Sequence, residues 1–193
     1  MYKRQVISRT GRYKVYPLVG MAITAVGMYL FSTLTVETSL TMLGLYMFVF
    51  GFGLGLVMQV LVLIVQNSFP VSMVGTATAT NNFFRQLGSA IGASLVGSLF
   101  IHNMRDNMAE RLPGAIAKLS PEQMQTVGPL FDGGSSNLTP HQVAQLPDAV
   151  KEAVLTSYND GLTPVFLMIV PLAVLAFLLL VPIVEDPLKE TVD

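Results

Sequence analysis

Long stretches without a single charged residue constrain this chain more than any other feature of its sequence. Residues 17–36, 38–84 and 161–184 contain no Asp, Glu, Lys or Arg. A bilayer hydrocarbon core about 30 Å thick is crossed by a helix of about 20 apolar residues. The first and third stretches can therefore each form one span. The second is too long for one span and must turn, and we expect the turn near Asn67–Pro70.

These lengths predict an all-α integral membrane protein with four spans. We place the spans at residues 17–36, 40–66, 76–102 and 162–184, with a turn at 67–75. Only 12% of the residues are charged, against roughly 25% in an average soluble domain. A soluble helical bundle is the alternative, but its buried helices would rarely run this far without a charge.

Basic residues ahead of the first span predict the orientation. They are Lys3, Arg4, Arg9, Arg12 and Lys14. Because basic residues gather on the cytoplasmic side of membrane proteins, we expect residues 1–16, the turn at 67–75 and the tail at 185–193 to be cytoplasmic. The segment 103–161 is then extracytoplasmic. In a bacterium, such a chain is a multi-pass protein of the plasma membrane with both termini in the cytoplasm.

The extracytoplasmic segment contains a short repeat, LSPEQMQTV at 119–127 and LTPHQVAQL at 138–146. In each copy a Ser or Thr precedes Pro, and Gln follows at the spacing of a capping box, so short helices should start at Ser120 and Thr139. A third helix is expected over 148–158. The segment is either an external cap over a cavity or a poorly packed connection, and we favour the second.

Glycines four residues apart mark the second and third spans, and Gly97 belongs to a neighbouring row of small residues. The glycines are Gly51, Gly55, Gly88, Gly92 and Gly97. Lipid gives helices little hydrophobic drive to associate, so close backbone approach at small residues holds such spans together. We therefore predict that these glycines pack against other helices. Bends that line a cavity are the alternative.

Arg85 is the only charged residue within the four predicted spans. An arginine at the bilayer centre costs about 2.5 to 3.5 kcal/mol on insertion scales, so its side chain should avoid lipid. It should face a water-filled cavity, exposed carbonyls or an acidic partner from elsewhere. The other polar side chains at or near membrane depth are Gln59, Gln66, Asn81, Asn82 and Gln86. They can bind a ligand or one another, and Arg85 can equally clamp neighbouring helices.

The residue types argue against several functions. Without cysteine there is no thiolate metal site, and His102 and His141 do not have metal-ligand spacing. A net charge of −1 provides no basic face for nucleic acid. No catalytic set is evident, so we expect neither an enzyme nor a cofactor. We interpret His102, at the outer edge of its span, as an interfacial residue.

Three parts of the chain resemble the major facilitator superfamily, specifically its fourteen-span drug:proton antiporters. SRTGRYK at 8–14 resembles the family's cytoplasmic loop motif, although Ser8 replaces its acidic residue and the leading glycine is absent. The matching positions are Arg9, Gly11, Arg12 and Lys14. The stretch 51–100 resembles the fourth helix, turn and glycine-rich fifth helix of the C-terminal half, and 164–192 resembles the last span and tail.

The resemblance implies that these are the last four of fourteen spans, within a C-terminal six-helix half. It places Met58 and Gln59 on a helix that lines the cavity, beside the span that carries Arg85. The resulting candidates for a substrate cavity are Met58, Gln59, Asn82, Arg85 and Gln86. The implied function is proton-driven export of hydrophobic or cationic drugs by alternating access, with a small-molecule substrate near the midplane.

The same resemblance implies that this part is inactive without the missing N-terminal spans. Residues 1–5, MYKRQ, match the translation of a transposon adapter used in sequencing libraries, so we expect them to be non-native and the true chain to extend upstream. Two other functions stay open: export of a metabolite or antibiotic by the same superfamily, and a small membrane scaffold or subunit that transports nothing.

Overall fold

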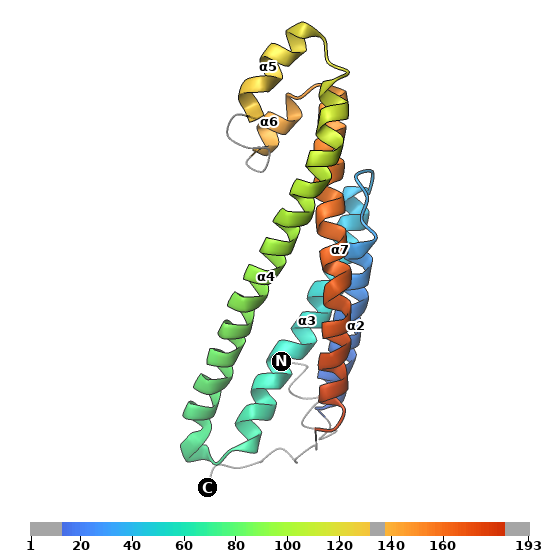
Figure 1. Cartoon of the computed structure of the whole chain (residues 1–193). Coiled ribbons are helices and arrows are strands. Elements are labelled where there is room, and N and C mark those ends of the chain that lie inside the picture. The colour runs from blue at the N-terminus through green and yellow to red at the C-terminus, as the bar shows by residue number, and fades with distance from the viewer. Residues whose placement is uncertain (1–12, 132–137, 184–193) are drawn as a thin grey trace. The chain divides into compact units, whose positions relative to one another are not determined.

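The computed structural model describes residues 13–131 and 138–183, most of which are helical (Figure 1). The elements in chain order are α2 Val15–Ser32, α3 Leu40–Ser68, the 3-10 helix η1 Val71–Met73, α4 Val74–Ile116, α5 Pro121–Phe131, α6 Pro140–Ala144 and α7 Asp148–Leu180. Four of them, α2, α3, α4 and α7, are long and apolar enough to cross a membrane. The expected fold class, a helical multi-pass membrane protein, is confirmed.

Two helices run further than the spans placed from the sequence. α4 continues past residue 102 to Ile116, and α7 begins at Asp148, so that the helix expected over 148–158 and the last span form one element. The continuation of α4 contains Met, Arg, Ala, Glu and Leu, which are good helix formers, and Pro113 comes only in its last turn. Which ends of the helices are cytoplasmic stays a prediction.

The chain forms two compact units. The first contains Met1–Leu30, Leu40–Gly92 and Met168–Asp193, and the second contains Phe31–Ser39 and Ala93–Leu167. α4 and α7 contribute to both.

In the first unit α2 and α3 approach so closely that only glycine fits at their contact. A β-carbon added to Gly53 would lie 2.6 Å from Oγ1 and 2.7 Å from the backbone nitrogen of Thr24. One added to Gly20 would lie 2.8 Å from the Gly53 carbonyl oxygen, and one added to Gly27 would lie 2.9 Å from the Phe50 backbone. The buried Thr24 hydroxyl donates a hydrogen bond of 2.8 Å to the Gly20 carbonyl. These glycines therefore set the distance between the two helices.

The glycines singled out from the sequence do not make this contact. A β-carbon added to any of them would meet nothing within 4 Å beyond its own local backbone: Gly51, Gly55, Gly88, Gly92 and Gly97. Gly53 lies two residues from Gly51 and from Gly55, which is about 200° around an α-helix. The α2 contact therefore uses the opposite side of α3. Packing of the five glycines against helices outside the described chain stays a prediction.

We predict that Gly53→Ala destabilises the protein by about 1–3 kcal/mol, because the atoms in its way are mostly backbone atoms that cannot move aside. In the matched variant Gly51→Ala the new methyl meets open space, and helix propensity favours alanine by up to about 1 kcal/mol. Thermal unfolding of both purified variants in detergent measures the difference. An unchanged Gly53→Ala protein would contradict the close approach, whereas a loss in Gly51→Ala would reveal packing against further helices.

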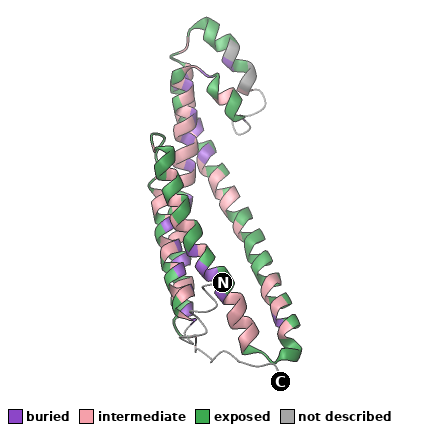
Figure 2. Ribbon diagram, turned by 180° about the vertical axis from the view of Figure 1, so that it is seen from behind, coloured by how far each residue is buried: buried purple, intermediate pink, exposed green. Residues whose placement is uncertain are grey.

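The second unit has a hydrophobic core of its own. Its buried members are Met104, Met108, Ala115, Val127, Leu138, Leu146, Val150 and Val154. They come from α4, α5, α7 and both copies of the short repeat (Figure 2). α4 and α7 touch closely here, since a β-carbon added to Gly161 would lie 3.0 Å from the Met104 backbone. The interpretation of this segment as a poorly packed connection is wrong, because apolar residues of each repeat are buried in one cluster.

The predicted helix starts at both copies of the repeat are confirmed. The Ser120 amide donates a hydrogen bond of 3.0 Å to Gln123 Oε1, and the Gln123 amide donates one of 3.3 Å to Ser120 Oγ. Thr139 and Gln142 make the same reciprocal pair, at 2.8 and 3.3 Å. Each pair satisfies two amides that the first turn of a helix leaves without partners, which is why α5 and α6 begin where they do.

An ion pair joins the extension of α4 to α7. Arg111 Nη2 lies 2.5 Å from Asp160 Oδ2, and the two side chains are 35% and 38% exposed. Beside this pair, the side-chain amide of Asn159 donates a hydrogen bond of 3.0 Å to the Leu34 carbonyl, which ties α7 to the connection between α2 and α3. These contacts cross-link three separate parts of the chain within the second unit.

We predict that Arg111 and Asp160 are energetically coupled. Each of Arg111→Ala and Asp160→Ala should lower the thermal stability, and the double variant should lose less than the sum, by about 0.5–1 kcal/mol for a pair that solvent partly screens. Lys118→Ala, which removes an exposed cation of the same unit, serves as the control and should change little. Strictly additive losses in the double-mutant cycle would contradict the coupling.

Candidate functional site

The candidate cavity residues lie on the two arms of a helical hairpin formed by α3 and α4. α3 ends at Ser68, and Pro70 follows with φ −59° and ψ 150°. Proline lacks an amide hydrogen and disfavours helix in the residue before it, so the chain must leave α3 here. The Met73 amide donates a hydrogen bond of 2.8 Å to the Pro70 carbonyl, which closes η1 and starts the return along α4.

One hydrogen bond across the hairpin provides a reference for how far each candidate residue lies from the turn. Gln66 Nε2 donates to Thr78 Oγ1 at 3.3 Å. The same number of residues separates Gln59 from Gln66 and Arg85 from Thr78, so each lies about 10 Å further along its own helix. Gln59 and Arg85, together with their sequence neighbours Met58 and Gln86, therefore lie at a similar distance from the turn. Asn82 lies one helical turn closer to it.

The candidates are open rather than packed within the described chain. Met58, Gln59, Arg85 and Gln86 are exposed and Asn82 is half-buried. Among the described residues, none of these five side chains forms a hydrogen bond or ion pair with another. The structure brings four of them to a similar distance from the turn, with Asn82 one helical turn closer, and shows no hydrogen bond or ion pair between them. Their role as a cavity stays a prediction.

This part of α4 has two contrasting faces. Residues four apart lie on one side of an α-helix. One row contains small and polar residues: Asn82, Gln86, Ser89 and Ala93. The opposite row contains large apolar residues, of which between 46% and 61% is exposed: Phe83, Leu87, Ile91 and Leu95. Most residues along this stretch of α4 are exposed (Figure 2). The apolar row suits lipid, and Arg85 lies closer to the polar row.

Of the four loop-motif residues, the structure describes only Lys14. Arg9, Gly11 and Arg12 lie outside the described residues, and Lys14 immediately precedes α2. In residues 13–131 and 138–183, no group of three His, Asp or Glu is arranged to hold a metal ion. His102 lies 3.4 Å from Asp106, and both side chains are exposed.

The ion pair between Asp160 and Arg111 was not expected from the sequence. Asp160 falls just before the fourth predicted span, and Arg111 falls in the segment expected to be extracytoplasmic, ahead of its predicted short helices. A signal was available, because Asn103, Asn107 and Arg111 recur every four residues and predict a polar face if α4 continues. The glycines of the α2–α3 contact were missed because they do not form pairs four residues apart: Gly20 and Gly27 are seven residues apart on α2, and Gly53 lies on α3.

Comparison with known proteins agrees with this architecture. A family model described as Major Facilitator Superfamily matches residues 4–93. An uncharacterized MFS-type transporter of Mycobacterium tuberculosis is 35% identical over 188 residues, which is 97% of this chain and 25% of that protein. No solved structure matches the chain.

Two proteins of Bacillus subtilis are also similar. Multidrug resistance protein 3 is 25% identical over 84% of this chain and 31% of its own length. Multidrug transporter protein MdtP is 29% identical over 77% of this chain and 30% of its own length. The chain thus spans between a quarter and a third of the length of these relatives. With its membrane-crossing helices, the chain belongs to the major facilitator superfamily, a family of transporters and not of enzymes.

Proposed function

We propose that the chain is the C-terminal part of a proton-coupled exporter of hydrophobic or cationic compounds. It would belong to the fourteen-span drug:proton antiporter branch, work by alternating access and be inactive alone. The names of the two Bacillus relatives support drugs as the substrate class, and the share of the relatives that the chain spans supports a larger whole. In this proposal the protein lies in the bacterial plasma membrane with both termini in the cytoplasm.

The observation that carries the proposal is the exposure of two polar side chains, Gln59 on α3 and Arg85 on α4. Gln59 and Arg85 are both exposed at the same distance from the turn. A permanent charge at this depth is too costly to leave against lipid. Further helices or cavity water must therefore cover it in the assembled transporter. A polar surface enclosed in this way, beside an apolar lipid face, is a suitable wall for a substrate cavity.

Arg85 also indicates how export can be coupled to protons. Among the described residues its guanidinium has no carboxylate partner. We infer that a carboxylate on a helix outside this chain pairs with it. A proton and a cationic substrate would both compete for that carboxylate, and neither can be held while the other is bound. This competition is what an antiporter requires, and the proton gradient supplies the energy.

We predict that the complete transporter exports cationic dyes from a bacterial strain that lacks its own efflux pumps. Arg85→Ala should reduce export at least about tenfold, equivalent to about 1.4 kcal/mol, and Gln59→Ala should reduce it less. Leu87→Ala, on the apolar face of the same helix, is the matched control and should export normally. Dye efflux is measured per amount of protein in the membrane.

Two outcomes would contradict the proposal. A complete wild-type protein that exports no compound would remove the exporter function. Arg85→Ala protein that is scarce or unstable, but exports normally per molecule, would show that Arg85 clamps helices and does not act in the cavity.

A further inference from the structure

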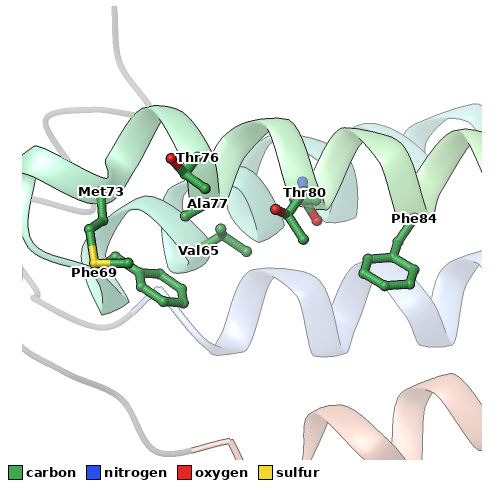
Figure 3. Close-up of a pocket in the computed structure, with 8 residues that line it drawn as sticks. Val65, Phe69, Met73, Thr76, Ala77, Thr80 and Phe84 are labelled. Carbon is green, nitrogen blue, oxygen red and sulfur yellow. The ribbon is translucent and has the colours of Figure 1, made fainter.

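A separate groove lies closer to the turn of the α3–α4 hairpin than Gln59 and Arg85 do (Figure 3). Its volume is about 320 Å³. The residues that line it are Val65, Phe69, Met73, Thr76, Ala77, Thr80, Asn81 and Phe84. They come from the end of α3, the connection that follows it, η1 and the beginning of α4, and none belongs to the proposed cavity set. This groove therefore needs its own explanation.

The groove combines apolar ends with a polar wall. Figure 3 shows Phe69 and Met73 at one end, Phe84 at the other and Thr80 between them. Thr76, Thr80 and Phe84 follow one another at four-residue intervals, so the groove extends about 12 Å along α4. Small-molecule sites are typically about 300–1,000 Å³ in volume, mostly apolar, with a few convergent polar groups. The groove matches the lower end of this range.

The polar groups of this wall are available. Thr76, Thr80 and Asn81 make no side-chain hydrogen bond with other described residues, whereas Thr24 and Ser89 bond the carbonyl four residues earlier in their helices. Within a bilayer an unsatisfied polar group is costly because no water replaces the missing partner. A bound molecule with its own hydrogen-bonding group would satisfy these side chains.

We propose that this groove binds a neutral lipophilic compound that carries a hydroxyl, carbonyl or amide group. Its apolar body lies between Phe69 and Phe84, and its polar group bonds Thr80 and Asn81. None of the lining residues is charged. An ionic ligand would therefore be desolvated without a counter-charge, which is unfavourable. The site is distinct from the cavity at Arg85 and does not depend on the proposed export function.

Two other occupants fit less well. A lipid acyl chain has no group to bond Thr80 or Asn81, so it would leave them unsatisfied. A further helix is about 10–12 Å across with its side chains, and the bulky Phe69 and Phe84 at the ends oppose its close approach. The chemistry of the lining thus favours a small neutral molecule.

A pair of alanines on one helix allows a matched test. Ala77 lines the groove and is 9% exposed, whereas Ala79 is exposed and lies outside it. Ala77→Leu fills the groove, and Ala79→Leu makes the same change next to it. The complete transporter is purified in nanodiscs and titrated with Nile red, which is neutral and has a carbonyl, and separately with the cation tetraphenylphosphonium. Fluorescence and equilibrium dialysis report the two affinities.

We predict that Ala77→Leu weakens Nile red binding at least about tenfold, as expected when a group several methylenes in size occupies the site. Ala79→Leu should change it less than about twofold, and tetraphenylphosphonium binding should be unaffected by either. Thr80→Val, which keeps the shape but removes the hydroxyl, should weaken Nile red binding by about two- to tenfold, the range for one hydrogen bond. If Ala77→Leu does not fold, the affinity of Thr80→Val for Nile red tests the proposal on its own.

The outcomes separate this site from the export function. Unchanged Nile red binding in Ala77→Leu and Thr80→Val would overturn the proposal, as would equal losses in Ala77→Leu and Ala79→Leu. Loss of a co-purified phospholipid in Ala77→Leu, with no effect of Thr80→Val on Nile red, would identify the occupant as an acyl chain and would also overturn it. If the expected pattern appears in a protein that exports nothing, the groove stands and the proposed export fails.

Discussion

The cost of placing charge in hydrocarbon governs the rest of this structure. Three stretches free of charged residues limit where the chain can cross the bilayer: α2, α3 and the apolar part of α7 lie in them, and α4 begins in the second one and continues past Arg85. A helix satisfies its own backbone, so its side chains alone decide what each face can contact. Arg85 is the exception in that pattern, because its charge requires a partner and no described residue pairs with its guanidinium. In the proposed transporter, further helices or cavity water would therefore cover this side of the hairpin.

Close packing supplies what the hydrophobic effect cannot supply between helices in lipid. α2 and α3 meet through Gly20, Gly27 and Gly53, where a single methyl would collide with backbone. The other side of α3 carries Gly51 and Gly55, where an added β-carbon would meet none of the described residues within 4 Å beyond the local backbone. A helix with glycines on two opposite sides, of which only one side contacts a described helix, suits a position between two neighbouring helices. One neighbour is α2, and in the proposed transporter the other would be a further helix.

Much of the fold could be predicted from the sequence because it depends on local rules. Charge-free length predicted the helices that cross the membrane, and capping-box spacing predicted the starts at Ser120 and Thr139. The choice of contacting glycines could not be predicted, since it depends on how two helices rotate against each other. Nor could the Arg111–Asp160 pair, which joins residues far apart in the chain. Among the cavity candidates, Met58 and Gln59 came from a resemblance and Asn82, Arg85 and Gln86 from their polarity within a span. Whether they line a cavity stays a prediction, because the described residues do not enclose them.

The hairpin distributes its polar groups in two chemically different sets. Close to the turn, Thr76, Thr80 and Asn81 offer uncharged hydrogen bonds beside aromatic rings, while about one turn further Arg85 contributes a full charge. Helical periodicity keeps the sets apart, because Phe84 and Arg85 are neighbours in sequence but point about 100° apart around α4. A charge that needs a counter-charge and an apolar groove that excludes one can therefore coexist on a single helix. That separation gives neutral and ionic ligands different places on the same hairpin.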